Sequence, residues 1–373
     1  MSERSQPPFH ADHVGSLLRP QKLREARDKF AKKAIGAAEL AAVEDEAIRE
    51  AVKLQEEVGL KSITDGEYRR GSWNKDFLEG FSGVKTVAGQ IEVRFHSDSG
   101  SVAGTPTGFR IEGKLGRPRG IFVDHFKFLK SIARHGVPKV TIPSPTLLHF
   151  RGGRGAIDEK AYPTMDGFYA DLARVYAEEI ADFAAAGCRY LQIDETNFAY
   201  LCDPALRRQV QSNIGEDPDK LPHTYAKLLN QAIAKRPKDM AVCMHICRGN
   251  NQSAWVAEGG YEPVAEALFN EVAVDGYFLE YDSPRAGDFA PLRFLPKGKI
   301  AVLGLVTTKL PALESKDELK RRIDEAARYA PLDQLALSPQ CGFASVAEGN
   351  KVTLADEIAK LRRVVEVARE VWG

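Results

Sequence analysis

The sequence has few cysteines and no excess of charge of either sign. It holds five cysteines in 373 residues, and its 52 Lys and Arg balance its 52 Asp and Glu, so the formal net charge is zero. An odd, sparse set of cysteines in a long neutral chain is not a disulfide framework. Because binding to nucleic acid needs a basic surface, the balanced charge argues against a nucleic-acid partner.

Long apolar runs are absent as well. No run approaches the roughly 18 residues of a membrane span, and residues 1–8 contain no apolar segment of the kind found in signal peptides. We therefore expect a cytoplasmic protein without a membrane partner. The hydrophobic fraction of 43% is ordinary for a globular protein with a large core.

Short apolar segments alternate with amphipathic helical patterns along the chain. Eight segments are typical of buried strands, and they cover residues 13–16, 61–65, 139–143, 190–194, 241–246, 276–280, 300–305 and 335–338. Alternating strands and helices predict a parallel sheet of the α/β class. Eight such units predict a single (β/α)8 TIM barrel that forms one catalytic domain over residues 1–373, with an open doubly wound sheet as the alternative. Residues 85–118 interrupt the alternation and are expected to form a β-hairpin insertion, in which residues 91–95 and 108–114 lie on either side of a Gly-, Ser- and Thr-rich middle.

Ionisable and polar residues gather at the ends of the expected strands. Active sites of (β/α)8 barrels lie at the carboxyl ends of the strands. The strand ends carry His13–Ser16, Asp65–Arg70, Asp194 and Glu195, His245–Asn250, Glu280–Asp282 and Ser338–Gly342. Because the strand bodies are apolar, this repeated placement indicates an enzyme rather than a binding or structural protein.

The most specific of these motifs is His245-x-Cys247. Residues i and i+2 of a strand point to the same side, so the imidazole and the thiol are expected to project together. Glu280 ends the next strand, and Cys341 follows the last one. One His, two Cys and one carboxylate form a plausible tetrahedral zinc set. The spacing alone leaves open that His245 hydrogen-bonds locally and that both cysteines only fill the core.

The charge of such a donor set bears on the reaction. Two thiolates and a carboxylate around zinc give a negative site, which is a poor Lewis acid for activating water. The set is better suited to binding a substrate thiol as a zinc-bound thiolate that remains nucleophilic. The implied reaction is alkyl transfer to a thiol.

The order of these motifs resembles the cobalamin-independent methionine synthases, and more closely their short single-barrel relatives. In that family a His-x-Cys, a Glu on the next strand and a Cys in a Pro-x-Cys-Gly turn hold zinc, and they match His245, Cys247, Glu280 and Cys341. The resemblance covers nearly the whole chain and implies a zinc-dependent methyltransferase that converts homocysteine to methionine. The family's duplicated N-terminal barrel has no counterpart here.

The resemblance also implies residues for the amino-acid end of homocysteine. Val14-Gly15-Ser16 is similar to the family segment that holds the carboxylate, and Glu67 and Asp194 match the carboxylates that bind the ammonium. Other roles remain open for these two residues, a salt bridge with neighbouring arginines for Glu67 and a helix N-cap for Asp194.

On the donor side the sequence departs from the family. Phe150 stands where the family has a Trp that stacks on the pterin, Tyr200 where a Glu holds it, and Val306 where a His protonates the leaving group. An amine is a poor leaving group that needs a general acid. We therefore expect a methyl or alkyl donor other than the usual folate, such as a methylcobalamin or corrinoid protein, a sulfonium or an epoxide.

Two further features are weaker candidates for the donor side. His13 is expected either to face the cavity, as an acid or a substrate contact, or to be a partly buried loop residue. Trp73, with Arg69 and Arg70, is expected either to cover an anionic group or to form a solvated rim. Arg19 has the same two roles open.

Two other functions remain open at this point. A zinc-dependent epoxide:thiol transferase of the coenzyme M type would need Arg69, Arg70 or Arg19 to bind a sulfonate. A metal-free decarboxylase related to uroporphyrinogen decarboxylase would need several arginines in its cavity. A monomer or a homodimer is expected in each case.

Overall fold

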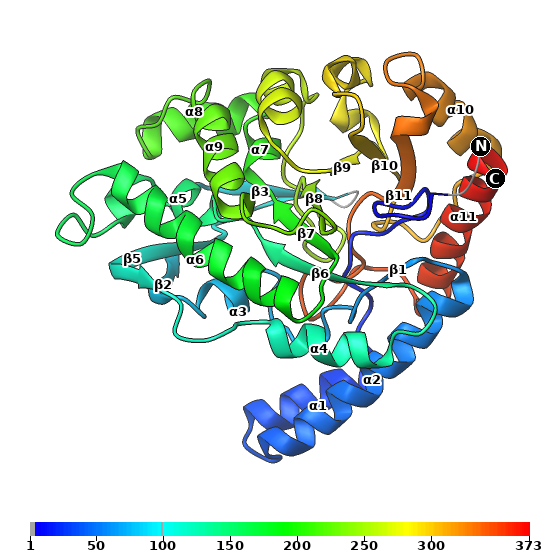
Figure 1. Ribbon diagram of the computed structural model, residues 1–373, viewed down its shortest axis with the longest axis horizontal. Helices are drawn as coiled ribbons and strands as arrows, with labels where there is room; N and C mark the ends of the chain where they lie inside the picture. The colour runs from blue at the N-terminus through cyan, green and yellow to red at the C-terminus, as the bar shows by residue number, and fades with distance from the viewer. Residues whose placement is uncertain (1–3, 98–99) are drawn as a thin grey trace.

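The centre of the protein is a curled parallel sheet with helices on its outer side (Figure 1). The computed structural model describes residues 4–97 and 100–373. The sheet has seven strands in the order β1-β6-β7-β8-β9-β10-β11. They are β1 (Ser62–Ile63), β6 (Val137–Pro143), β7 (Tyr190–Glu195), β8 (Ala241–Ile246), β9 (Gly276–Glu280), β10 (Ile300–Val306) and β11 (Leu335–Pro339).

The last six of these strands lie within two residues of their expected bounds. These strands could be predicted from their continuous apolar runs, because both faces of the sheet are buried. In β7, β9 and β11 every residue is buried. The strand expected over 61–65 is shorter, because only Ser62 and Ile63 pair with β6.

The strand expected over residues 13–16 is not formed, and this expectation was wrong. The backbone N–H groups of Phe9 and His13 donate to the Asp12 carboxylate. The carbonyl of Gly15 accepts from the Thr64 hydroxyl, and Gly15 has a φ of 140°. Backbone groups of this segment therefore form hydrogen bonds with side chains, whereas in a strand they would bond to the backbone of neighbouring strands.

The N-terminal segment nevertheless lies beside both edge strands of the sheet. Ala11 forms a parallel bridge with Leu337 of β11, and the N–H of Leu17 donates to the carbonyl of Gly66, beyond β1. The structure thus contains seven of the eight expected strands, with an irregular segment where the eighth was expected.

The helices surround the sheet, and several begin or end at residues that commonly cap helices. They are α1 (Gln21–Ala31), α2 (Ala37–Val58), α3 (Lys75–Leu78), α4 (Val123–Ile132), α5 (Leu147–Phe150), α6 (Met165–Ala185), α7 (Asn197–Tyr200), α8 (Pro204–Asn213), α9 (Leu221–Ile233), α10 (Lys316–Ala326) and α11 (Leu354–Trp372). For example, α11 begins with a capping box of Thr353 and Asp356, and α2 ends at Gly59 with a φ of 94°. No helix in the described part of the chain is long and apolar enough to cross a membrane.

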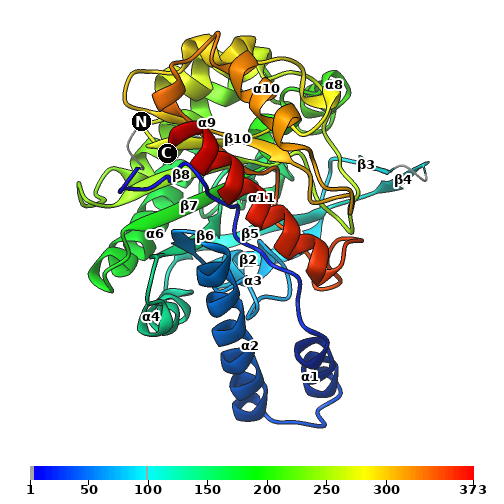
Figure 2. The ribbon, with the colours of Figure 1, turned by 90° about the vertical axis from the view of Figure 1, so that its right-hand side faces the viewer.

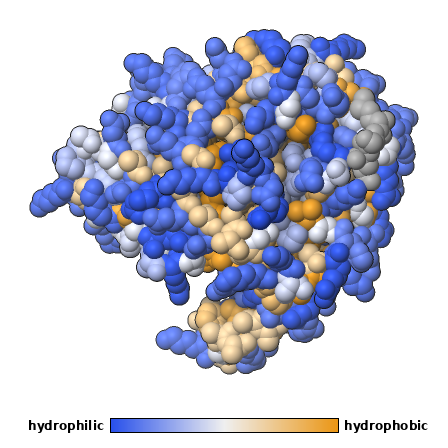
Figure 3. Space-filling model, viewed as in Figure 1, coloured by the Kyte–Doolittle hydropathy of each residue, from blue (hydrophilic) through white to orange (hydrophobic). Residues whose placement is uncertain are grey.

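Two features project from this body. The α1–α2 hairpin extends below the sheet, and the β3–β4 ladder extends to one side (Figure 2). The surface seen in Figure 3 is mostly hydrophilic, with paler hydrophobic residues at the end of the α1–α2 hairpin.

The insertion forms β-structure, but the expected pairing was wrong. The structure has two antiparallel ladders: β2 (Ser82–Ala88) pairs with β5 (Thr107–Gly116), and β3 (Val93–Ser97) pairs with β4 (Gly100–Gly104). One hairpin was expected between residues 91–95 and 108–114, whereas these two segments belong to different ladders. Residues 98 and 99 of the insertion lie outside the described residues.

Candidate metal centre and substrate cavity

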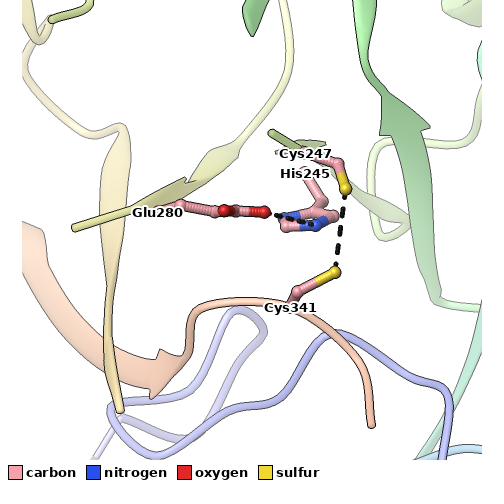
Figure 4. A group of neighbouring side chains, drawn as sticks. All are labelled: His245, Cys247, Glu280 and Cys341. Carbon is pink, nitrogen blue, oxygen red and sulfur yellow. Dashed lines mark hydrogen bonds and ion pairs between the residues drawn. The ribbon is translucent and has the colours of Figure 1, made fainter. Parts of the chain in front are cut away.

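Four side chains from the ends of β8, β9 and β11 converge at the carboxyl edge of the sheet (Figure 4). His245 lies in β8, Cys247 directly follows β8, Glu280 ends β9, and Cys341 follows β11. Their donor atoms all lie within 4.8 Å of one another. The structure thus brings together the four residues that the sequence singled out as a metal set.

The distances leave room for an ion between the four side chains. The sulfur atoms of Cys247 and Cys341 are 3.7 Å apart, and Nε2 of His245 lies 3.9 Å from Oε1 of Glu280. Among the described residues, neither ring nitrogen of buried His245 has a hydrogen-bond partner. Among these residues Oε2 of Glu280 has none either, although it lies 3.6 Å from Nη2 of Arg285. Buried polar atoms normally have partners. These unused donors fit a tetrahedral zinc site with two sulfurs, one nitrogen and one oxygen.

The surroundings orient the donors and tune their charge. The N–H of Arg248 donates to Oε1 of Glu280 at 3.0 Å, and the N–H of Gly249 donates to the Cys247 sulfur at 3.4 Å. The hydrogen bond from Cys247 holds the pKa of the Cys341 thiol well below its ordinary value, against the opposing effect of burial. Burial raises the pKa of Glu280. A thiolate at Cys341 is the form in which cysteine binds metals.

The metal set lies beside a cavity with about 970 Å³ of empty space, part of it open solvent. Its lining includes His245, Cys247 and Cys341 but not Glu280, which is fully buried. The cavity is also lined by Val14, Ser16, Glu67, Ser72, Trp73, Asn74, Phe95, Pro106, Thr107, Arg151, Asp194, Thr196, Tyr200, Gly249, Asn250, Asn251, Val256, Gly342, Ser345 and Val346. A ligand in this space can therefore reach both sulfurs.

The residues expected at the amino-acid end of the substrate lie on this cavity. Val14, Ser16, Glu67 and Asp194 line it, whereas Gly15 contributes only backbone close to Glu67. Oε1 of Glu67 accepts from the Thr141 hydroxyl at 2.9 Å and lies 3.5 Å from Nη1 of Arg70. The alternative salt bridge of Glu67 is thus present, and it coexists with a position at the cavity.

Asp194 does not cap a helix. Its Oδ1 accepts from the Gln192 amide at 2.6 Å, and helix α7 begins after Thr196. Burial, together with the negative charge of Glu67, raises the pKa of Asp194 to about 7. Two carboxylates side by side at a cavity favour a cation between them.

The donor-side candidates divide into two groups. Trp73 and Tyr200 line the cavity. Phe150 does not, because it is fully buried and packs edge-on against Tyr200 at 6.0 Å. His13 is turned away as well: its Nε2 lies 3.1 Å from the carbonyl of Ser62, and burial lowers its pKa to about 4. Of the two roles left open for His13, the structure favours the buried loop residue over the one at the cavity.

The arginines expected to bind a sulfonate are engaged elsewhere. Arg69 pairs with Glu44 and Asp45, and Arg19 donates to the backbone carbonyls of Ala344 and Val346. Arg70 donates to the carbonyl of Thr141 at 2.7 Å. None of the three lines the cavity. These contacts count against a sulfonate site at these positions.

Several cavity residues were not predicted from the sequence. Phe95, Pro106 and Thr107 come from the insertion, and Arg151 follows α5. Neither feature lies at a predicted strand end, which was the signal used to find the site. Arg151 is the single arginine of the cavity lining in the described residues, which disfavours a polycarboxylate decarboxylase.

Known proteins resemble this chain over nearly its whole length. YxjG, an uncharacterized protein of Bacillus subtilis (strain 168), is 44% identical over 372 residues, which cover 99% of this chain and 96% of the relative. The crystal structure of the putative vitamin-B12 independent methionine synthase from Listeria monocytogenes matches with a TM-score of 0.78 and 39% identity, and covers 99% of this chain and 100% of that one.

A longer relative is more distant. The 5-methyltetrahydropteroyltriglutamate–homocysteine methyltransferase of Thermotoga maritima is 24% identical over 376 residues, which cover 98% of this chain but 45% of the relative. The family model described as the catalytic domain of cobalamin-independent synthase matches residues 9–370. The chain belongs to this cobalamin-independent synthase family.

Proposed function

We propose that the protein transfers a methyl or other alkyl group to the sulfur of a small thiol, with homocysteine as the acceptor and methionine as the product. The observation that carries the proposal is the set of His245, Cys247, Glu280 and Cys341, whose donor atoms lie within 4.8 Å of one another beside the cavity. These four residues would hold zinc. When bound, zinc would favour the thiolate form of the acceptor at neutral pH.

The chain's own residues place the acceptor. Glu67 and Asp194 bind its ammonium, and Ser16 with the neighbouring backbone binds its carboxylate. The cavity position of Ser16, Glu67 and Asp194 supports these roles. Held in this way, the acceptor sulfur is directed toward Cys247 and Cys341.

The transfer is a displacement at carbon. The acceptor thiol loses its proton to solvent, its sulfur forms a bond to the alkyl carbon, and the bond from that carbon to the donor's leaving group breaks with its electron pair. Val306, fully buried at the end of β10, supplies no proton to the leaving group. A leaving group that departs without protonation, such as a neutral sulfide from a sulfonium, therefore suits this chain.

The first test measures metal in the purified protein. Mass spectrometry should find about one zinc per chain, which Cys247→Ser and Cys341→Ser should lose. Cys202→Ser is the matched control, because Cys202 is also buried but donates to the carbonyl of Phe198 away from the cluster. Zinc retained in both cluster variants would contradict the ligand set.

The second test follows methionine formation from homocysteine. Donors of three kinds should be compared: 5-methyltetrahydrofolate, methylcobalamin and S-methylmethionine. We expect turnover with a sulfonium or cobalamin donor at a rate well above that with the folate, and no turnover by Cys341→Ser. A zinc-loaded protein that methylates no thiol with any of them would overturn the proposed function.

A further inference from the structure

Arg151 is a buried cation without an anionic partner. Its side chain lines the cavity, yet the residue is only 4% exposed. No ion pair in the described parts of the chain includes Arg151, its Nε has no hydrogen-bond partner, and its side-chain partner Tyr200 is neutral. A charge that is buried and unpaired is costly. The charge of Arg151 would therefore be compensated by a ligand that brings a negative charge into the cavity.

The acidic residues of the described cavity lining form no ion pair with Arg151. Glu67 is held by Thr141 and Arg70, and Asp194 is held by Gln192. The cavity thus has an acidic wall formed by Glu67 and Asp194, and a separate basic position at Arg151.

The wall around Arg151 is aromatic and belongs in part to the insertion. The guanidinium lies 5.5 Å from the centre of the Tyr200 ring. The carbonyl of Arg151 accepts from the N–H of Gln90, which precedes β3, and Phe95 of β3 lines the same cavity. Aromatic faces beside a guanidinium suit a ligand that combines an anion with an apolar or cationic group.

Tyr200 also connects this wall to the metal set. Tyr200, Arg151 and Cys247 all line the same cavity. A compact molecule anchored at Arg151 can therefore present a carbon to a thiol held near Cys247.

We propose that Arg151 binds a carboxylate, or a group of the same shape such as a sulfonate, on the molecule that donates the alkyl group. The proposal rests on the proposed function, because it names the donor class for the same cavity. A guanidinium matches such a group with two parallel hydrogen bonds. The alkyl donor is then a small molecule that carries an anionic group close to the alkyl group that it transfers.

The amino-acid acceptor is the other possible source of a carboxylate. Its expected place is Ser16, whose hydroxyl accepts from the N–H of Ala344, three residues after Cys341. The experiment must therefore separate a donor carboxylate from the acceptor carboxylate.

Calorimetric titration with two sulfonium probes tests the proposal. Dimethylsulfoniopropionate carries a carboxylate, and trimethylsulfonium carries the same reactive methyl group without one. The proteins are the wild type as purified, Arg151→Met and Arg151→Lys. Arg154→Met is the matched control, because Arg154 is about a third exposed and faces Glu159 at 3.9 Å.

We expect Arg151→Met to weaken binding of dimethylsulfoniopropionate by about tenfold or more, as for the loss of a charge-assisted hydrogen-bond pair. Arg151→Lys should restore part of this affinity, Arg154→Met should match the wild type, and trimethylsulfonium should bind no more weakly to Arg151→Met. A merely structural role of Arg151 would weaken both probes alike, and that result would overturn the proposal.

Homocysteine provides the second arm. Its affinity should be the same in the wild type and Arg151→Met. If Arg151→Met instead weakens homocysteine and leaves dimethylsulfoniopropionate unchanged, Arg151 binds the acceptor carboxylate and the proposal is wrong. Binding is measured without turnover, so the two proposals can fail separately. If carboxylate binding depends on Arg151 but the protein alkylates no thiol, the anion site is supported and the proposed function is contradicted.

Discussion

Lys139 and Asp12 form an ion pair inside the protein, with 3.2 Å between Nζ and Oδ1 and no exposure of either side chain. Nζ also donates to the carbonyl of His13 at 2.5 Å, and Oδ2 of Asp12 accepts from the Tyr190 hydroxyl at 2.7 Å. The pair therefore ties the N-terminal segment to β6 and β7. It lies next to residues 13–16, where a first strand was expected.

Breaking this pair from one side should be costly. Lys139→Met leaves the Asp12 carboxylate buried and uncompensated, so we expect the free energy of unfolding to fall by about 3–5 kcal/mol. Urea denaturation followed by circular dichroism measures the change. Lys127→Met is the control, because Lys127 pairs with Asp124 at the surface, and its effect should stay within about 0.5 kcal/mol. A similar small loss in Lys139→Met would mean that Asp12 is satisfied by its other hydrogen bonds.

The Lys139–Asp12 pair also shows why part of the fold was predictable and part was not. The strands from β6 to β11 in the sheet have apolar bodies and polar ends, and this contrast located both the strands and the four converging residues. Residues 13–16 carry a similar local pattern. Whether they pair as a strand depends on distant groups, namely Lys139 and Thr64, which the local sequence does not reveal.

The errors at the site have the same origin. Phe150 and Arg151 are adjacent, yet one packs into the core and the other lines the cavity. The short helix α5 sets these directions, and four residues are too few for a helical pattern to be read from the sequence. The insertion was misassigned because its glycine-rich strands fix their register only weakly. Its contribution of Phe95 to the cavity was missed for that reason.

The buried carboxyl of Glu357 should make stability depend on pH. Burial raises its pKa to about 8, and Oε2 accepts from the N–H of Leu18 at 2.8 Å. Between about pH 4.5 and pH 8 the unfolded chain therefore holds fewer protons at this group than the folded one, so its contribution to stability is present at low pH and is lost as the pH rises. Over this pH range the free energy of unfolding should fall by a few kcal/mol because of Glu357, and Glu357→Gln should remove this dependence. Denaturation at a series of pH values measures it.

The matched control for this slope is Glu366→Gln. Glu366 is partly exposed on the same helix, α11, and pairs with Lys316 at the surface. Its replacement should leave the pH dependence as in the wild type. An unchanged slope in Glu357→Gln would show that the carboxyl is ionised in the folded protein.

Gly342 should tolerate no side chain. A methyl group at this position would collide with the Ser16 hydroxyl, in the turn that carries Cys341. We expect Gly342→Ala to lower the free energy of unfolding by about 1–3 kcal/mol through overpacking and to weaken zinc binding. Gly113→Ala is the control, because nothing lies within 4 Å of a methyl group there. Unchanged zinc content and stability in Gly342→Ala would mean that Ser16 can move without disturbing Cys341.

Glu67 provides the most direct test of how the acceptor is held. Glu67→Gln keeps the shape of the side chain and an oxygen for the Thr141 hydroxyl but removes the negative charge. If Glu67 binds the substrate ammonium, the dissociation constant of homocysteine should rise by about tenfold. The dissociation constant of 4-mercaptobutanoate, which is homocysteine without its amino group, should not change. Calorimetry with both thiols measures the two values, and zinc content should match the wild type because Glu67 is not among the four clustered donors. Equal weakening of both thiols would instead place the effect in the contact between Glu67 and Arg70, and the ammonium site would then be assigned to Asp194 alone.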